Sequence, residues 1–224
     1  MKYVIHTCPD RLWYVEDFLV PSMKKQGINA KDIIVDNDAE RMGTLKFYLK
    51  SFSQIPKDTY GTWHLQDDVV LSKHFAERTK QYDDGLVNGF CSNYCKQKVP
   101  GVVKPDKMWY SFPCMRIPNI LIHDFLHWFY NYAIKQQKWQ HMVEANKFID
   151  AFFMYFIKEQ YPNLRMRNVS PNLVDHVDYL LGGSTINAVK FQTLDRRASF
   201  WNEPDVIRNL EWELSQYQFN NGKK

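Results

Sequence analysis

Apolar residues in the first seventy positions fall into short runs separated by longer stripes. The short runs are rich in β-branched and aromatic residues, as is typical of strands, and they lie at 2–7, 33–35 and 62–66. Between them, residues 13–26 and 44–52 carry apolar side chains at helical spacing. Strand, helix, strand, helix, strand is the order of a parallel sheet built by right-handed crossovers. The pattern predicts an α/β domain with a mostly parallel central sheet flanked by helices.

The same patterns continue in the rest of the chain. Helices are predicted at 73–82, 118–135, 142–159 and 205–218, and strands at 86–90, 108–112 and 173–177. An irregular stretch from Ser92 to Lys107 holds several lysines and two prolines, and it is interpreted as a connector or a lid. From residue 190 onward the chain is polar. We therefore expect one domain over 1–189 and a C-terminal tail with a helix over 190–224.

Polar side chains gather where the three predicted parallel strands end, at Thr7 to Arg11, Asp36 to Asp38 and Gln66 to Asp68. In parallel sheets, ligands bind beyond the carboxyl ends of the strands. The adjacent carboxylates of Asp67 and Asp68 repel each other unless a cation lies beside them, and a divalent metal held by oxygen ligands is the usual one. A solvated surface turn would explain the acid pair alone. The convergence of three strand ends favours a binding site.

Composition narrows the class of protein. The 224 residues are 45% hydrophobic and 24% charged, which are ordinary globular values, and 16% of them are aromatic. The net charge of +4 suits an anionic ligand such as a nucleoside diphosphate or nucleic acid. The N-terminus lacks the apolar region of a signal peptide, and no run is long enough to span a membrane. We expect a soluble protein of the cytoplasm, or of the host cytoplasm if a phage encodes it.

Two segments carry a family resemblance. Gln66-Asp67-Asp68 follows the third strand, and Ser170-Pro171-Asn172-Leu173-Val174-Asp175-His176-Val177 follows about a hundred residues later. Their order and spacing resemble the GT-A fold of nucleotide-sugar-dependent glycosyltransferases. The first segment is similar to that family's D-x-D or E-D-D motif, and the second to its P-x-L-V-x-H-h-G strand. The resemblance covers roughly Tyr3 to Thr185 and implies a single GT-A-like, Rossmann-like domain.

The resemblance implies a metal-assisted glycosyltransferase that moves a sugar from a nucleoside-diphosphate sugar to an acceptor hydroxyl, with Mn²⁺ or Mg²⁺ as cofactor. Asp68 and His176 would be the metal ligands, although a buried structural histidine is the alternative for His176. Gln66 departs from the motif, because a neutral amide replaces its first acid. The residues implied in donor binding are Thr7, Asp10, Arg11, Asp36, Asn37, Arg41, Gln66 and Asp67. We add Arg197, because Arg196-Arg197 precedes Phe200-Trp201 and this segment could close over the donor diphosphate.

Asp150 is the candidate general base for a transfer that inverts the anomeric centre. It lies on an aromatic-rich helix, where burial would raise the pKa of its carboxyl into a useful range. A place on the solvated face of that helix is the alternative, and a retaining reaction requires no such base. Trp109 and Tyr110 are candidates for stacking on the acceptor, with core packing as the alternative.

Two classes of acceptor fit the sequence. One is a carbohydrate or lipid-linked glycan, and the other is a hydroxylated base in DNA, as in glycosyltransferases of phages that modify their genomes. The lysines between 96 and 107 favour a polyanionic acceptor. The contrasting class is a non-catalytic nucleic-acid-binding or assembly protein on a degenerate α/β fold. Such a protein would bind DNA in a salt-dependent way and ignore nucleotide sugars. The sequence does not indicate an oligomeric state.

Overall fold

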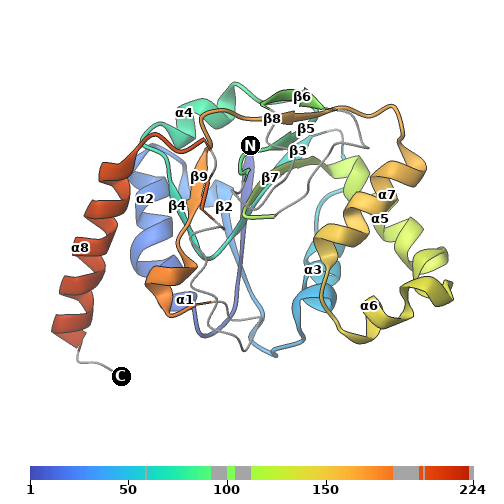
Figure 1. Ribbon diagram of the computed structural model, residues 1–224, viewed down its shortest axis with the longest axis horizontal. Coiled ribbons are helices and arrows are strands. Elements are labelled where there is room, and N and C mark those ends of the chain that lie inside the picture. Colours follow the sequence, from blue (N-terminus) through green and yellow to red (C-terminus); the bar gives the residue numbers. More distant parts are fainter. Residues whose placement is uncertain (59, 92–99, 104–111, 184–196, 199, 222–224) are drawn as a thin grey trace.

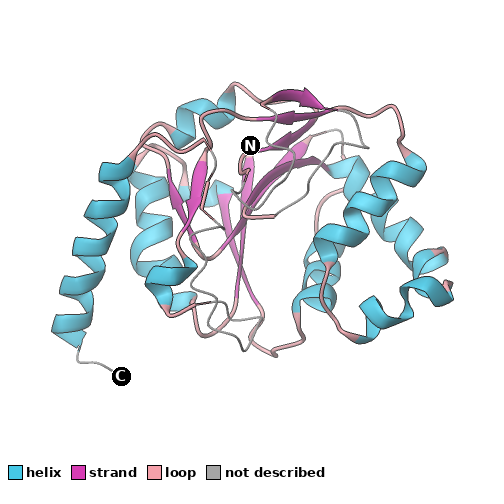
Figure 2. Cartoon of the chain, in the orientation of Figure 1, coloured by secondary structure: helices cyan, strands magenta, loops and turns pink. Residues whose placement is uncertain are grey.

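A twisted sheet runs through the middle of the molecule, with helices on both of its faces (Figure 1, Figure 2). The computed structural model describes the chain except for residues 59, 92–99, 104–111, 184–196, 199 and 222–224. The predicted strand at 108–112 and the lysine-rich stretch therefore lie mostly outside the described residues.

The main sheet has seven strands in the order β2-β1-β3-β7-β5-β8-β6. Strand β1 is parallel to both β2 and β3, and β5 is parallel to β8. Strand β7 is antiparallel to β3 and β5, and β6 is antiparallel to β8. Five of the described strands therefore share one direction, which confirms the predicted α/β class. Their bounds are β1 Lys2–Thr7, β2 Ile33–Asn37, β3 Gly61–Gln66, β5 Leu86–Asn88, β6 Gly101–Val103, β7 Cys114–Pro118 and β8 Met166–Asn168.

A second, two-stranded sheet lies beside the main one. Strand β4 (Val69–Leu71) pairs antiparallel with β9 (Val174–His176), and the register places Val69 opposite His176. Strand β9 was predicted from its apolar run, but not as the partner of β4. The pairing brings the two segments of the family resemblance together, because β4 begins directly after Asp68.

Helices cover the two faces. On one face lie α3 (Thr44–Ser53), α5 (Asn119–Asn131), α6 (Gln140–Glu144) and α7 (Ile149–Gln160). On the other lie α1 (Leu12–Tyr14), the π-helical turn η1 (Val15–Leu19), α2 (Val20–Lys25) and α8 (Pro204–Asn221), with α4 (Phe75–Lys80) at the end of the sheet. Short 3₁₀ helices are η2 (Ala30–Asp32), η4 (Ala133–Lys135), η5 (Gln137–Trp139) and η6 (Asp178–Leu181).

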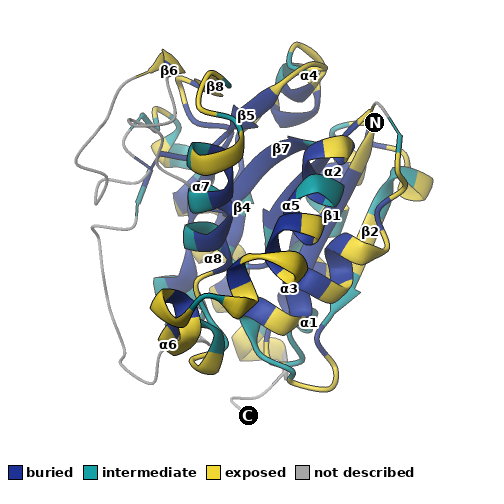
Figure 3. Ribbon diagram, turned by 90° about the vertical axis from the view of Figure 1, so that its right-hand side faces the viewer, coloured by how far each residue is buried: buried dark blue, intermediate teal, exposed yellow. Residues whose placement is uncertain are grey.

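The core consists of two apolar clusters separated by the sheet. Successive residues of a strand face opposite sides, so Val4 joins the cluster under α3, α5 and α7, whereas Tyr3 and Ile5 join the other. Figure 3 shows the buried strands behind α5 and α7. Leu210 and Leu214 of α8 belong to the second cluster, and Tyr217 stacks on Trp13. The C-terminal helix is thus packed against the α/β core. None of the described helices has the length and apolar character that a membrane crossing needs.

One predicted helix is interrupted. The apolar stripe at 142–159 predicted a continuous helix, but α6 ends at Glu144 and α7 begins at Ile149. Asn146 and Phe148, on either side of Lys147, adopt left-handed backbone angles with φ of 51° and 66°. A left-handed residue other than glycine costs about 1–2 kcal/mol. The break is held by contacts to α3, which lie too far away in the sequence for helical spacing to reveal.

Candidate active site

A cleft with a volume of about 330 Å³ opens at the carboxyl ends of β1 and β3. The register of β1 places His6 beside Asp36 of β2 and Gln66 of β3, so the three predicted strand ends meet at one edge of the sheet. Four segments line the cleft: the end of β1, the loop before α3, the end of β3 and the α6–α7 loop. The lining includes six of the predicted site residues, namely Thr7, Asp10, Arg41, Gln66, Asp67 and Asp68.

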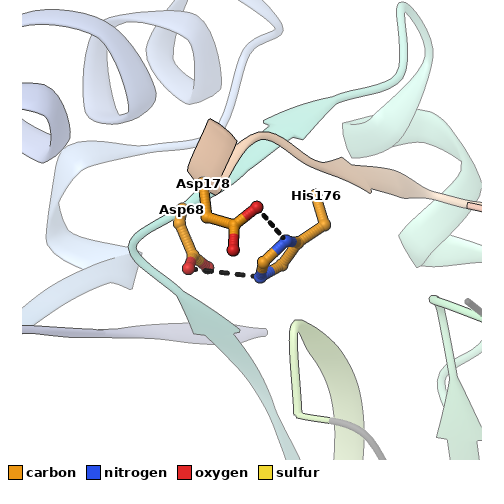
Figure 4. A group of neighbouring side chains, drawn as sticks. All are labelled: Asp68, His176 and Asp178. Carbon is orange, nitrogen blue, oxygen red and sulfur yellow. Dashed lines mark hydrogen bonds and ion pairs between the residues drawn. The ribbon is translucent and has the colours of Figure 1, made fainter. Parts of the chain in front are cut away.

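Asp68, which lines the cleft, forms a cluster with His176 and Asp178, which do not line it (Figure 4). Nε2 of His176 lies 3.2 Å from Oδ2 of Asp68, and Nδ1 of His176 lies 3.1 Å from Oδ1 of Asp178. His176 and Asp178 are buried, and the side chain of Asp68 is 15% exposed. Asp178 was not among the predicted site residues. The sequence offered one indication of Asp178, its position two residues after His176. That indication is useful only once η6 is known to begin at Asp178.

The cluster fits a divalent metal. Two neighbouring ligands of an octahedral ion, each about 2.1 Å from it, lie about 3 Å apart, which is close to the separation of Asp68 and His176. Asp178 accepts a hydrogen bond from Nδ1 of His176, which leaves the lone pair of the imidazole on Nε2, toward Asp68. A carboxylate and an oriented imidazole are ligands that suit Mn²⁺, and a carboxylate also suits Mg²⁺.

Asp67 lies beside this cluster in a buried position. Its Oδ2 accepts a hydrogen bond from the backbone N–H of Cys8 at 3.2 Å. Burial and then the charge of Asp68 raise the pKa of Asp67 to about 7, against the opposing effects of Thr7 and Arg11. The negative charge on one of these two carboxylates therefore disfavours ionisation of the other at the end of β3. A cation bound at Asp68 would relieve this repulsion.

The rim of the cleft carries an ion pair. Arg41 donates two hydrogen bonds to the carboxylate of Asp10, at 2.8 and 2.9 Å. The bonds to Arg41 lower the pKa of Asp10, and both side chains are exposed. Asp38 accepts from the backbone N–H groups of Met42 and Gly43, at 2.8 and 3.2 Å, and so shapes the loop that presents Arg41.

The α6–α7 loop is docked onto the N-terminus of α3. The backbone oxygen of Asn146 accepts from the N–H of Leu45 at 3.2 Å, and its side-chain oxygen accepts from the N–H of Lys46 at 3.0 Å. Two otherwise unpaired N–H groups of the helix are thereby satisfied. The side chain of Asn146 also packs on Gly43, where a β-carbon would collide with it. This docking places Lys147 in the lining of the cleft.

Asp150 is the second residue of α7, and its Oδ1 accepts a hydrogen bond from the N–H of Ala151 at 2.9 Å. It is partly exposed and does not line the cleft, but its charge acts on Tyr48, which does. Burial raises the pKa of Tyr48, and the charges of Asp67, Asp68 and Asp150 raise it further. The predicted base is thus close to the cleft on the side formed by α3 and α7.

The remaining predicted residues lie around the site or beyond it. Asp36 and Asn37 end β2 but do not line the cleft, and Trp109 and Tyr110 lie outside the described residues. Arg11 is buried and donates to the backbone oxygens of Leu181, at 2.6 Å, and Gly183.

Arg197 also lies outside the lining of the cleft. Its Nε donates to Oδ2 of Asp175 at 2.6 Å, and its guanidinium donates to the hydroxyl of Tyr179 at 3.0 Å. In this structure Arg11 and Arg197 both hold parts of the chain around η6.

Comparison with known proteins gives structural matches alone. No protein-family model and no curated protein sequence matches the chain. Among solved structures, TarS of S. aureus (residues 1–349) has a TM-score of 0.48 and 11% identity, over 81% of this chain and 62% of that chain. The galactosyltransferase LgtC, in complex with donor and acceptor sugar analogs, has a TM-score of 0.47 and 10% identity, over 95% and 96%. A mutant Drosophila β1,4-galactosyltransferase 7, in complex with manganese, UDP-Gal and xylobiose, has a TM-score of 0.41 and 10% identity, over 92% and 73%.

Two of these matches are galactosyltransferases by their descriptions. The chain spans 62% of the length of TarS. A likeness at 10–11% identity concerns the fold, and folds host many activities. The chemistry of this protein therefore has to be argued from its own residues.

Proposed function

We propose that this protein is a metal-assisted glycosyltransferase that uses a nucleoside-diphosphate sugar. The observation that carries the proposal is the cluster of Asp68, His176 and Asp178 at the end of a cleft that opens over the carboxyl ends of parallel strands. The imidazole is already oriented, and a divalent cation would offset the repulsion between Asp68 and the second carboxyl group, Asp67.

The donor would lie along the cleft with its diphosphate at the cluster. Asp68 and His176 would hold Mn²⁺ or Mg²⁺, which neutralises charge on the leaving diphosphate. Thr7, Gln66 and Asp67 offer polar groups beside the donor, with Asp10 and Arg41 at the rim. Lys147 brings a further positive charge to the lining. Arg11 and Arg197 support the proposal indirectly, since they fix the segment on both sides of η6.

The acceptor would enter from the side of α7. In a transfer with inversion, the acceptor oxygen forms a bond to the anomeric carbon while the bond from that carbon to the phosphate oxygen breaks. The acceptor proton passes to the carboxylate of Asp150, and the nucleoside diphosphate leaves. Asp150 supports this role by its place at the start of α7, near the Tyr48 wall of the cleft.

A thermal-shift experiment tests the proposal. Wild-type protein is melted with UDP-, GDP-, CMP- and dTDP-sugars, each with and without Mn²⁺. A ligand that binds the native state raises Tm, and we expect one nucleotide to do so more strongly with Mn²⁺. Asp68→Asn should abolish the Mn²⁺-dependent part of the shift. Asp84→Asn, which changes an exposed acid outside the cleft, is the matched control. If no nucleotide sugar changes Tm under either condition, the proposal is wrong.

A further inference from the structure

Tyr48 has a buried hydroxyl that no part of the described protein satisfies. Its side chain projects from α3 into the lining of the cleft and is 3% exposed. Its hydroxyl makes no hydrogen bond with the described residues. The side chain of Gln66 is close enough to lower the pKa of Tyr48, but its contact with the hydroxyl lacks the geometry of a hydrogen bond. The polar end of an otherwise apolar side chain is therefore buried in the wall of the cleft without a partner among the described residues.

Other buried tyrosines of this protein behave differently. The hydroxyl of Tyr3 is 2.7 Å from Oγ1 of Thr79, and the hydroxyl of Tyr14 donates to the backbone oxygen of Val69 at 2.9 Å. Buried tyrosine hydroxyls generally find such partners, because an unsatisfied one loses its hydrogen bonds to water. Tyr48 is thus an exception, and a bound ligand could supply the hydrogen-bond partner that its hydroxyl lacks.

The ring of Tyr48 is held firmly in place. It packs on His6, with ring centroids 4.1 Å apart, and stacks on Phe112 at 5.5 Å. His6 is fixed in turn by a 2.9 Å hydrogen bond to His64. A group whose rotamer is locked by such packing can bind a ligand without first being ordered.

Tyr48 lies on the α3 side of the cleft, and its hydroxyl is within electrostatic reach of both chemical sides. The charges of Asp67, Asp68 and Asp150 all act on its hydroxyl, in addition to burial, so the group stays protonated and able to donate. The metal-ligand cluster belongs to the side of β4 and β9, whereas Asp150 belongs to the side of α3 and α7 (Figure 1). Within the proposed function, the group between the diphosphate and the base is the sugar that is transferred.

We propose that the hydroxyl of Tyr48 donates a hydrogen bond to an oxygen of the sugar unit of the bound nucleotide sugar. The inference rests on the proposed function and assigns a sugar-binding residue within that site. In this arrangement the nucleoside binds at the rim, where Asp10 and Arg41 lie, and the diphosphate binds at the cluster around Asp68.

Tyr48→Phe tests the inference because it removes the hydroxyl alone. In the ligand-free protein, this variant should be at least as stable as wild type, since no protein hydrogen bond is lost. Tyr14→Phe is the matched control and should lower stability, because it leaves the backbone oxygen of Val69 without its donor. Both are compared by urea unfolding.

Binding is then measured by calorimetry with the nucleotide sugar that stabilises wild type and with the corresponding free nucleoside diphosphate, both in Mn²⁺. Tyr48→Phe should lower the affinity for the nucleotide sugar about fivefold, which corresponds to the loss of one neutral hydrogen bond. The affinity for the free nucleoside diphosphate should stay unchanged. Equal weakening of both ligands would place the hydroxyl on the diphosphate and overturn the inference. Unchanged binding of both would overturn it as well, as would a loss of stability like that of Tyr14→Phe.

The two proposals fail in different ways. If wild type binds a nucleotide sugar and Tyr48→Phe binds it equally well, only the role of Tyr48 is wrong. If wild type binds no nucleotide sugar, the proposed function and the role of Tyr48 are both wrong.

Discussion

His6 and His64 lie with their imidazole rings nearly parallel, 9° apart, and Nε2 of His6 is 2.9 Å from Nδ1 of His64. One of these nitrogens must accept the hydrogen bond, so both rings cannot be protonated at once. Burial lowers the pKa of His64 to about 3, and burial together with His64 lowers the pKa of His6 well below its usual range. The wall of the cleft beneath Tyr48 is thus a neutral histidine pair.

The pair predicts a loss of stability in mild acid. Below about pH 6.5 the unfolded chain protonates both histidines, whereas the native protein does not. The free energy of unfolding therefore falls as the pH drops from 6.5 toward 3, by up to about 1.4 kcal/mol per pH unit for each histidine. Asp67 acts in the opposite direction between its ordinary pKa and about 7, because the native carboxyl holds a proton that the unfolded chain has released. With two histidines against one carboxyl, we expect stability to rise with pH between 4 and 6.5.

Urea unfolding between pH 4.5 and 7.5 measures this slope. His64→Gln should reduce it by about one proton, while His127→Gln, on an exposed face of α5, should leave it unchanged. Equal slopes in wild type and His64→Gln would contradict the assignment of a neutral buried pair.

Asp178→Asn is predicted to weaken metal binding without removing a metal ligand. The amide oxygen of Asn accepts a weaker hydrogen bond from Nδ1 of His176 than a carboxylate does, and the amide NH₂ group can turn toward the ring instead. The imidazole is then held less firmly and is less basic. We expect the affinity for Mn²⁺ to fall at least about tenfold. The loss of the free Mn²⁺ signal in electron paramagnetic resonance gives the dissociation constant, with Asp84→Asn as the control. Identical constants for wild type and Asp178→Asn would show that Asp178 does not orient the ligand.

Gly43→Ala should destabilise the protein more than the same change at another left-handed glycine. Gly43 has φ of 85° and packs against the side chain of Asn146, whereas Gly27 has φ of 86° and open space around it. Gly27→Ala should cost about 1–2 kcal/mol of strain. Gly43→Ala should cost about 1–3 kcal/mol more, because the α6–α7 loop must move. Chemical denaturation measures both, and equal losses would mean that the loop is not docked as described.

Arg11→Gln is predicted to loosen the turn that carries Asp178. Arg11 donates hydrogen bonds to the backbone oxygens of Leu181 and Gly183, which lie three and five residues after Asp178. Removing a buried cationic donor costs about 1.5–3 kcal/mol for each hydrogen bond that it makes. We expect lower stability and faster amide exchange at 178–183, measured by hydrogen–deuterium exchange. Unchanged exchange in this segment would instead free Arg11 for the donor-binding role that the family resemblance implies.

Local periodicity predicted the strands and helices that form the floor of the cleft. Residues 2–7, 33–37 and 61–66 become β1, β2 and β3, and their ends converge, because apolar runs and crossover handedness are properties of nearby residues. Asp68 and His176 lie 3.2 Å apart, and their role as metal ligands stays a prediction. This pairing came from the family resemblance, since the β4–β9 ladder joins residues about a hundred positions apart.

Other features could not be read from the sequence because distant contacts decide them. The break at 145–148 lies inside an apolar stripe and exists because Asn146 caps α3. Arg11 and Arg41 have the same charge in neighbouring loops, yet one is buried against carbonyls and the other pairs with Asp10 on the surface. Tyr48 lies within the apolar stripe at 44–52 that predicted a helix, but helical spacing does not tell whether a buried hydroxyl has a partner.

Strand β9 connects the C-terminal segment to the metal-ligand cluster. Its side chains alternate, so His176 faces Asp68 while the fully buried carboxylate of Asp175 faces away and binds Arg197 and the N–H of Ala198. A chain shortened before Arg197 would leave that carboxylate without its cation, and loss of one partner of a buried pair costs about 3–5 kcal/mol. The damage would reach His176, because it is the next residue in the chain. Fusions and truncations that spare the cleft can therefore still disturb the proposed metal site through β9.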